Sequence, residues 1–166
     1  MQVSFGGNKV NLYGKEVKVG DKAPEFKAIN NDLSVFDSKE NLGKIVVYSV
    51  VPSIDTGVCS LQTRAFNEDA AELGEDVKII TVSCDLPFAQ KRFCAVEGID
   101  NSITVSDYRF HDFGKKFGFL MEDLALLARG VVVVDKDGKI TYTEYVSEVT
   151  NEVNFKAALD AIKALK

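Results

Sequence analysis

Cys59 is the side chain whose position in this sequence best suits it for chemistry. It ends the run Pro52-Ser53-Ile54-Asp55-Thr56-Gly57-Val58-Cys59, between an apolar strand-like segment, 45–51, and a helix-like segment, 61–73. A cysteine there lies in the first turn of a helix, at the carboxyl end of a strand. The unpaired N–H groups and the positive dipole end of that turn favour anions. Because a thiolate is the reactive form of cysteine, we expect a nucleophile at this position.

The segments that must position Cys59 alternate between strand and helix. The apolar run 45–51 reads as a strand covered on both faces, and 61–73 carries apolar residues on one helical face. The later segments follow the same logic: a strand at 77–83, a helix starting at Pro87, a short helix at 111–117, a hairpin of 131–134 with 140–146, and a last helix with Thr150 or Asn151 as N-cap. This order predicts an α/β fold with a mixed sheet.

The first 20 residues resemble a small β-hairpin that turns at Gly6-Gly7-Asn8. Such a hairpin is too small to fold alone, so we expect one domain over residues 1–166. Hydrophobic residues make up 46% of the chain, which is enough for a full core.

Composition argues against several classes of partner and location. The net charge is −5 and no basic block occurs, which disfavours nucleic acid or an anionic membrane as the main partner. The N-terminus has no basic or apolar signal region, and no apolar run approaches membrane-spanning length. We therefore expect a cytoplasmic protein, with no disulfide scaffold because only three cysteines are present.

A metal site is not expected from the spacing of possible ligands. The three cysteines are scattered, no Cys-x-x-Cys pair occurs, and His111 is the single histidine. His111 has no cysteine or acid motif near it in the sequence, so we interpret it as a surface or helix-cap residue and treat a Cys–His hydrolase as a weak alternative. The phenylalanines, among them Phe26, Phe88, Phe93 and Phe110, are expected mostly in the core, with a few lining an apolar site mouth.

Several blocks of the sequence together resemble one known family. Pro52-x-x-x-Thr56-x-x-Cys59 is similar to the peroxiredoxin signature, and the full run from Pro52 to Cys59 resembles its thiol peroxidase (Tpx) branch. Arg92-Phe93-Cys94 followed by Glu97-Gly98, and Ala128-Arg129 leading into 131–134, also match that branch. The resemblance covers essentially the whole chain and implies a thioredoxin-like fold with an N-terminal hairpin. One departure is Gly57, where many relatives have proline.

The resemblance implies a role for Cys59 and for three other residues. Cys59 would be the peroxidatic cysteine, whose thiolate attacks a hydroperoxide and becomes a sulfenic acid. Thr56 would cap the helix and bond the thiolate or the peroxide, and Pro52 would end the strand and exclude water. Arg129 would face Cys59, stabilise its thiolate and orient the peroxide. Without the resemblance these three would read as a plain N-cap, a strand-ending proline and a surface arginine.

The same resemblance assigns Cys94 as the resolving cysteine, which would form a disulfide with Cys59. Both cysteines fall on predicted helices, and a disulfide requires Cα atoms within about 7 Å. We therefore expect partial unwinding around both after oxidation. Cys84 reads as an inert half-buried thiol, although the residues alone do not decide between Cys84 and Cys94 as resolver.

The predicted function is reduction of hydrogen peroxide and of alkyl or lipid hydroperoxides without any cofactor or metal. The resemblance further implies recycling by thioredoxin and a homodimer that packs near the active site. Two other functions stay open. A thioredoxin-fold disulfide carrier would show no peroxide-dependent step, and a redox-sensing or holdase binding protein would oxidise readily but turn over poorly.

Overall fold

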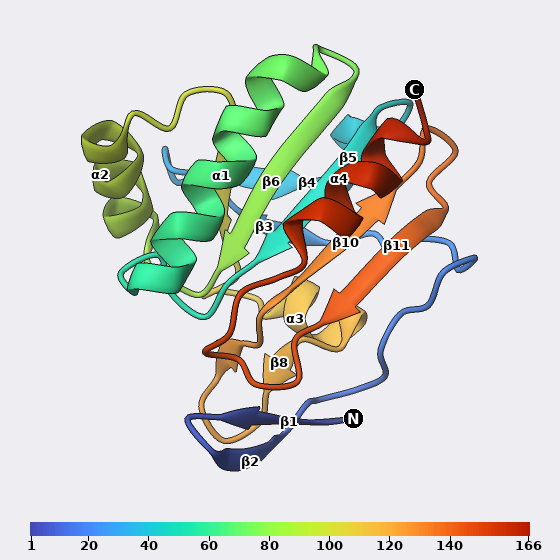
Figure 1. The fold of residues 1–166 in the computed structure, drawn as a ribbon. Coiled ribbons are helices and arrows are strands. Elements are labelled where there is room, and N and C mark those ends of the chain that lie inside the picture. The colour runs from blue at the N-terminus through green and yellow to red at the C-terminus, as the bar shows by residue number, and fades with distance from the viewer.

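The computed structural model describes residues 1–166 and places a seven-stranded mixed sheet at the centre of the molecule (Figure 1). The strand order is β11-β10-β5-β6-β7-β3-β4. The strands are β1 (Gln2–Phe5), β2 (Asn8–Asn11), β3 (Lys27–Ile29), β4 (Val35–Asp37), β5 (Ile45–Val50), β6 (Val77–Ser83), β7 (Ile103–Ser106), β8 (Leu120–Met121), β9 (Leu126–Leu127), β10 (Gly130–Val134) and β11 (Ile140–Tyr145). The helices are a 3₁₀ turn (Ser38–Asn41), α1 (Gly57–Leu73), α2 (Pro87–Glu97), α3 (Asp112–Phe117) and α4 (Phe155–Lys163).

The middle of the sheet is parallel and its edges are antiparallel. β5 pairs in parallel with β6, and β6 with β7, whereas β10 lies antiparallel to both β5 and β11. All six residues of β5 are buried, as expected for a parallel strand covered on both faces. The carboxyl ends of β5, β6 and β7 therefore share one edge of the sheet, where the loops that lead to α1, α2 and α3 begin.

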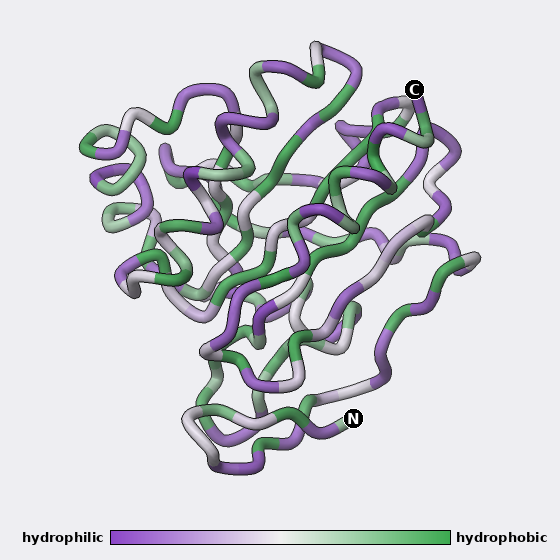
Figure 2. The backbone as a smooth tube through the Cα atoms, viewed as in Figure 1, coloured by the Kyte–Doolittle hydropathy of each residue, from purple (hydrophilic) through white to green (hydrophobic).

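Alternate residues of the central strands supply two separate cores. Ile45 and Val47 of β5 pack with Phe66 of α1 and Ile162 of α4 on one face. Val46, Tyr48 and Val50 point to the opposite face, where α3 and the N-terminal segment cover them. Figure 2 shows apolar residues concentrated along the central strands, with polar residues prevailing on the outer loops. The period of two in the strands thus fixes which helix covers which face.

The structure confirms most of the predicted elements and corrects their ends. The hairpin of β1 and β2 spans 2–11 rather than the first 20 residues, and the antiparallel pairing of β10 with β11 is as expected. α1 begins at Gly57, one turn before the predicted 61. The prediction of Thr150 or Asn151 as the cap of the last helix was wrong, because Asn154 accepts from the backbone N–H of Ala157 and α4 begins at Phe155.

The pairing of short strands and the position of two phenylalanines differ from expectation. β3, β4 and β7 were not predicted, because three or four residues give too little alternation to recognise. Of the phenylalanines expected mostly in the core, Phe88 and Phe110 are 66% and 38% exposed, whereas Phe26 is buried. None of the helices combines the length and the apolar character needed to cross a membrane.

Candidate active site

Cys59 lies in the first turn of α1 and is completely buried. The loop 51–56 connects the end of β5 to the helix, and the sulfur packs in a small apolar cluster with Val51, Ile54 and the partly buried Phe93. Thr63 donates its hydroxyl to the carbonyl of Cys59 at 2.9 Å, which is a local bond within the helix. The predicted position of the cysteine, at a helix start beyond a buried strand, is therefore confirmed.

Arg129 donates directly to the sulfur of Cys59. The residue stands immediately before β10, is only 2% exposed, and places Nη2 3.0 Å from Sγ. Its Nε donates to the Val149 carbonyl at 2.8 Å, and Nη1 donates to Oε1 of Gln62 at 3.0 Å. All three nitrogens of the guanidinium are thus fixed in one orientation. A charged N–H aimed at a sulfur can stabilise negative charge that develops on it during a reaction.

Gln62 holds the arginine in place and was missed in the sequence. It is buried one helical turn after Cys59, and its amide nitrogen donates to Oγ of Ser49 in β5 at 2.8 Å. The amide therefore links β5, α1 and Arg129. The available signal was a polar residue on the inner face of the helix, opposite a serine within an otherwise apolar strand.

Pro52 and Thr56 both line a hollow beside Arg129, the residue that donates to Cys59. Together with Phe5, Val149 and Arg129 they line a hollow of about 220 Å³. Pro52 is buried. Thr56 is exposed at the N-cap position, but its hydroxyl makes no cap bond. It donates instead to the carbonyl of Ser53 at 3.3 Å, so the expected bond from a first-turn N–H to Thr56 is not made.

Asp85 fastens the cysteine loop to the next strand and was also missed. Its carboxylate accepts from the hydroxyl of Ser53 at 2.7 Å, the backbone N–H of Ile54 at 2.8 Å and the hydroxyl of Ser83 at 2.6 Å. The hydroxyl of Ser106, at the end of β7, donates to its carbonyl oxygen. Asp85 therefore joins the loop that carries Cys59 to the start of α2, which carries Cys94. Asp85 stands two residues before Pro87, which begins α2, and this local position does not predict that its carboxylate would bond the Cys59 loop.

Cys94 faces away from Cys59 in the described state. Its sulfur lies 3.5 Å from Oγ1 of Thr104 in β7, whereas the preceding residue, Phe93, packs against the apolar cluster that contains Cys59. Successive residues of an α-helix point about 100° apart, which explains how neighbours face different groups. β10, next to Arg129, and β7 are separated by β5 and β6, so roughly 14 Å lies between these two strands. All three cysteines are free thiols.

Cys84 and His111 lie together, which the sequence did not indicate. Cys84 follows β6, and its Sγ is 3.8 Å from Nδ1 of His111, which precedes α3. Asp107 lies within 4.8 Å of both, so the fold brings a cysteine and an acid to His111 although no such motif surrounds it in the sequence. Burial, and then the negative charge of Asp107, raises the pKa of the Cys84 thiol to about 12. A thiol whose pKa is raised in this way does not suit a nucleophile, so the environment of Cys84 does not favour a Cys–His hydrolase.

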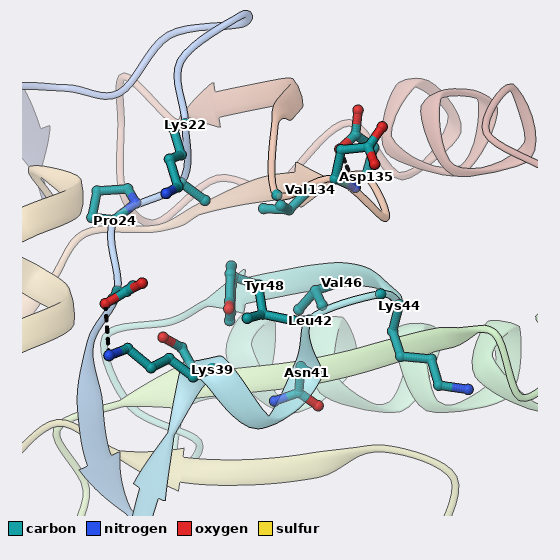
Figure 3. Close-up of a pocket in the computed structure, with 16 residues that line it drawn as sticks. Lys22, Pro24, Lys39, Asn41, Leu42, Lys44, Val46, Tyr48, Val134 and Asp135 are labelled. Carbon is teal, nitrogen blue, oxygen red and sulfur yellow. Dashed lines mark hydrogen bonds and ion pairs between the residues drawn. The ribbon is translucent and has the colours of Figure 1, made fainter.

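A further cavity of about 190 Å³ lies at the opposite end of β5 (Figure 3). Lys22, Lys39 and Lys44 surround it, and Lys39 pairs with Glu25 at 3.1 Å. Burial raises the pKa of the Tyr48 hydroxyl in its wall. Cysteine and histidine are both absent from its lining, so it offers no nucleophile comparable to Cys59.

Comparison with known proteins assigns the chain to a family. The Redoxin family model matches residues 18–161. The thiol peroxidase of Bacillus subtilis (strain 168) is 51% identical over 164 residues, which cover 99% of this chain and 98% of that protein. The thiol peroxidase of Oceanobacillus iheyensis is 55% identical over 157 residues, with 95% of each chain covered.

Solved structures agree with these sequence matches. A peroxiredoxin-like protein from Aquifex aeolicus superposes with a TM-score of 0.93 at 41% identity, covering 99% of this chain and 97% of that one. The thiol peroxidase from Chromobacterium violaceum gives a TM-score of 0.87 over 99% and 96% of the two chains; at 18% identity it supports the fold alone. The chain therefore belongs to the Redoxin family and, within it, to the thiol peroxidase group of the peroxiredoxins.

Proposed function

We propose that the protein reduces hydrogen peroxide and organic hydroperoxides, with Cys59 as the peroxidatic cysteine. The observation that carries this proposal is the buried sulfur in the first turn of α1, 3.0 Å from a fixed arginine nitrogen. The family membership supports the same reaction. The Cys59 thiolate attacks the terminal oxygen of ROOH, the O–O bond breaks, and RO⁻ leaves and takes up a proton as ROH. The cysteine becomes a sulfenic acid.

The neighbouring residues position the two reactants in this scheme. Arg129 stabilises the thiolate and donates to the peroxide oxygens as negative charge moves onto the leaving oxygen. The Thr56 hydroxyl, at the rim of the hollow, orients the peroxide, and Pro52 closes one side of the site against water. The hollow bounded by Phe5, Pro52 and Thr56 gives room for the organic group of an alkyl hydroperoxide.

Cys94 is the proposed resolving cysteine. Its thiol attacks the sulfenic sulfur, the S–OH bond breaks, and water leaves as the Cys59–Cys94 disulfide forms. Because Cys94 faces Thr104 and Phe93 packs against the apolar cluster that contains Cys59, the segment around Cys94 in α2 must rotate or unwind first. The loop held by Asp85 must loosen at the same step, so both segments are expected to lose protection from hydrogen exchange after oxidation.

The reductant and the assembly are further parts of the proposal. A thioredoxin dithiol reduces the disulfide by exchange, and the cytoplasm is the compartment in which such reductants keep thiols free. The protein is proposed to be a homodimer, because Leu61, Phe88 and Val96 present apolar side chains on α1 and α2 near the active site. Light scattering of wild type and Phe88→Glu tests this, with a dimer expected only for the wild type.

The proposed reaction is tested by adding about one equivalent of cumene hydroperoxide to the reduced protein and mapping cysteines by mass spectrometry without reduction. A rapid Cys59–Cys94 disulfide is expected, together with one equivalent of cumyl alcohol. Cys59→Ser should consume no peroxide, and Cys94→Ser should complete one oxidation but not turn over with thioredoxin. Normal turnover of Cys94→Ser would remove Cys94 as resolver, and a Cys59–Cys84 disulfide would replace it.

The same experiment separates the two other functional classes. In a disulfide carrier, Cys59 would remain a reduced thiol after peroxide is added. The absence of a Cys-x-x-Cys pair already argues against that class. A redox-sensing or holdase protein would oxidise at Cys59 but recycle poorly with thioredoxin.

A further inference from the structure

Three potential metal ligands meet at the carboxyl edge of the sheet, away from the cysteine of the peroxide reaction. Cys84 directly follows β6, Asp107 directly follows β7, and His111 directly precedes α3. Because β6 and β7 run parallel, their carboxyl ends lie side by side. One ligand atom from each residue lies within 4.8 Å of the other two, and Cys84 Sγ is 3.8 Å from His111 Nδ1.

Asp107 is a fully buried carboxylate without a cationic side-chain partner. Its two oxygens accept from the backbone N–H groups of Phe113 and Gly114 at 3.0 and 2.8 Å, and none of the six ion pairs in the structure includes it. Buried charges in proteins are ordinarily paired with an opposite charge or a metal ion. A cation placed between Asp107, Cys84 and His111 would supply the missing charge.

We propose that Cys84, Asp107 and His111 bind one zinc-like divalent cation. A sulfur, an imidazole nitrogen and a carboxylate oxygen form a donor set typical of Zn²⁺, with water as the fourth ligand. In a tetrahedral zinc site, bond lengths of about 2.3 Å to sulfur and about 2.0 Å to nitrogen put those ligands about 3.5 Å apart. The observed separation of Cys84 Sγ from His111 Nδ1 is 3.8 Å, so those two ligands need almost no movement.

Binding would exchange a proton for the metal without any change of oxidation state. The Cys84 thiol releases its proton to solvent, its sulfur bonds to Zn²⁺, and the neutral His111 donates its Nδ1 lone pair. The metal overrides the local preference for a protonated thiol, because a coordinating cysteine is deprotonated outright. Cys84 and His111 are both partly exposed, which leaves an entry path from solvent. Asp107 keeps its backbone bonds, since each carboxylate oxygen has a second lone pair.

The spacing of these residues explains why such a site could not be predicted from the sequence. Cys84 and Asp107 are 23 positions apart on different strands, and Asp107 and His111 are four apart across a loop and a helix cap. The site is proposed from the tertiary contact alone and revises the expectation that no metal would bind.

The first experiment titrates Zn²⁺ into reduced, chelator-treated protein in competition with a chromophoric chelator. One equivalent should bind to wild type and to Cys59→Ser and Cys94→Ser, which serve as controls because they remove the other two thiols. Binding should weaken at least 100-fold in Cys84→Ser and in His111→Asn. Asparagine is chosen because His111 has φ = 48°, a left-handed conformation that asparagine tolerates.

Co²⁺ provides a second readout that identifies the ligands. A thiolate-to-Co²⁺ charge-transfer band in the near ultraviolet is expected with wild type and absent with Cys84→Ser, and bound Zn²⁺ should slow alkylation of Cys84. Circular dichroism checks each fold, and if Cys84→Ser misfolds then His111→Asn decides. The proposal is overturned if wild type binds no Zn²⁺, if binding survives in folded His111→Asn, or if Cys59→Ser abolishes it. Because the proposed peroxide reduction uses Cys59 and Cys94 and neither Cys84 nor His111, failure of zinc binding and failure of that function are distinguishable.

Discussion

Nη2 of Arg129 lies 3.0 Å from Sγ of Cys59, although the two residues are 70 positions apart in the chain. The contact exists because β10, which follows Arg129, pairs with β5, which leads to Cys59. Gly130 lies opposite Val50 in that pairing. The register of two neighbouring strands therefore brings a cation to the thiol at the helix start.

Replacing Arg129 by lysine should slow the peroxide step despite the equal charge. Lysine cannot donate at once to Val149, Gln62 and Cys59 as the guanidinium does. Loss of one charge-assisted hydrogen bond, at about 1.5–3 kcal/mol, predicts roughly 10–100-fold slower oxidation. Stopped-flow oxidation measures this, with Arg109→Lys as a surface control. Equal rates for wild type and Arg129→Lys would remove the arginine geometry from the mechanism.

Gln62→Met should slow the same step indirectly, because it releases Arg129 from its buried partner. The cost to stability is expected at about 1–3 kcal/mol, since Nη1 of Arg129 is left without an acceptor. Gln90→Met is the matched control: Gln90 is also a buried glutamine, but it bonds Ser83 and Val105 away from the thiol. We expect the two variants to lose comparable stability. Only Gln62→Met should oxidise slowly. Slow oxidation in both variants would point to general loosening instead.

Thr56→Val should slow oxidation more than Thr56→Ser, because only serine keeps a hydroxyl at the hollow beside Arg129. In the structure that hydroxyl bonds the carbonyl of Ser53 at 3.3 Å and caps no helix N–H. The stability of both variants should therefore stay within about 0.5 kcal/mol of wild type, as for most surface substitutions. Denaturant unfolding and single-turnover oxidation measure the two effects. A large stability loss in Thr56→Val with unchanged oxidation would show a structural role only.

Asp85→Asn should loosen the loop that carries Cys59. Asparagine offers one acceptor oxygen where the carboxylate accepts from Ser53, Ile54 and Ser83. A loss of about 1–3 kcal/mol predicts hydrogen exchange of residues 53–59 roughly 5–150-fold faster, and faster disulfide formation with Cys94. Asp55→Asn, in the same loop but exposed, is the control. Unchanged exchange in Asp85→Asn would show that the loop is held by other contacts.

Glu148→Gln should reduce the sensitivity of the N-terminal hairpin to acid. Hydrogen bonds from Thr150, then from Ser4 and Gly6, lower the pKa of Glu148 to about 2. A carboxylate with a depressed folded-state pKa stabilises the fold above its usual pKa near 4.5, and this contribution is lost as the pH falls toward 2. The free energy of unfolding of the wild type should therefore fall more than that of Glu148→Gln between pH 5 and pH 2. Thermal unfolding across that range, with Glu152→Gln as control, tests the difference.

Local patterns predicted the strand, the loop and the helix that present Cys59. Those elements lie within about 30 residues of one another, and their apolar periodicity is visible in the chain. The same reasoning failed for β3, β4 and β7, which are too short for a pattern, and for the cap of α4. At the start of α4, the side chain of Asn154, three residues beyond Asn151, accepts the capping hydrogen bond from Ala157.

The sequence by itself determined the class of fold and the candidate nucleophile, because both depend on neighbouring residues. Only the tertiary structure decided which polar groups meet that nucleophile. Gln62, Asp85 and Arg129 acquire their contacts through strand pairing and helix packing, and so do Cys84 and His111 at the proposed metal site. Such contacts join residues distant in the chain, so they leave no periodic signal in it.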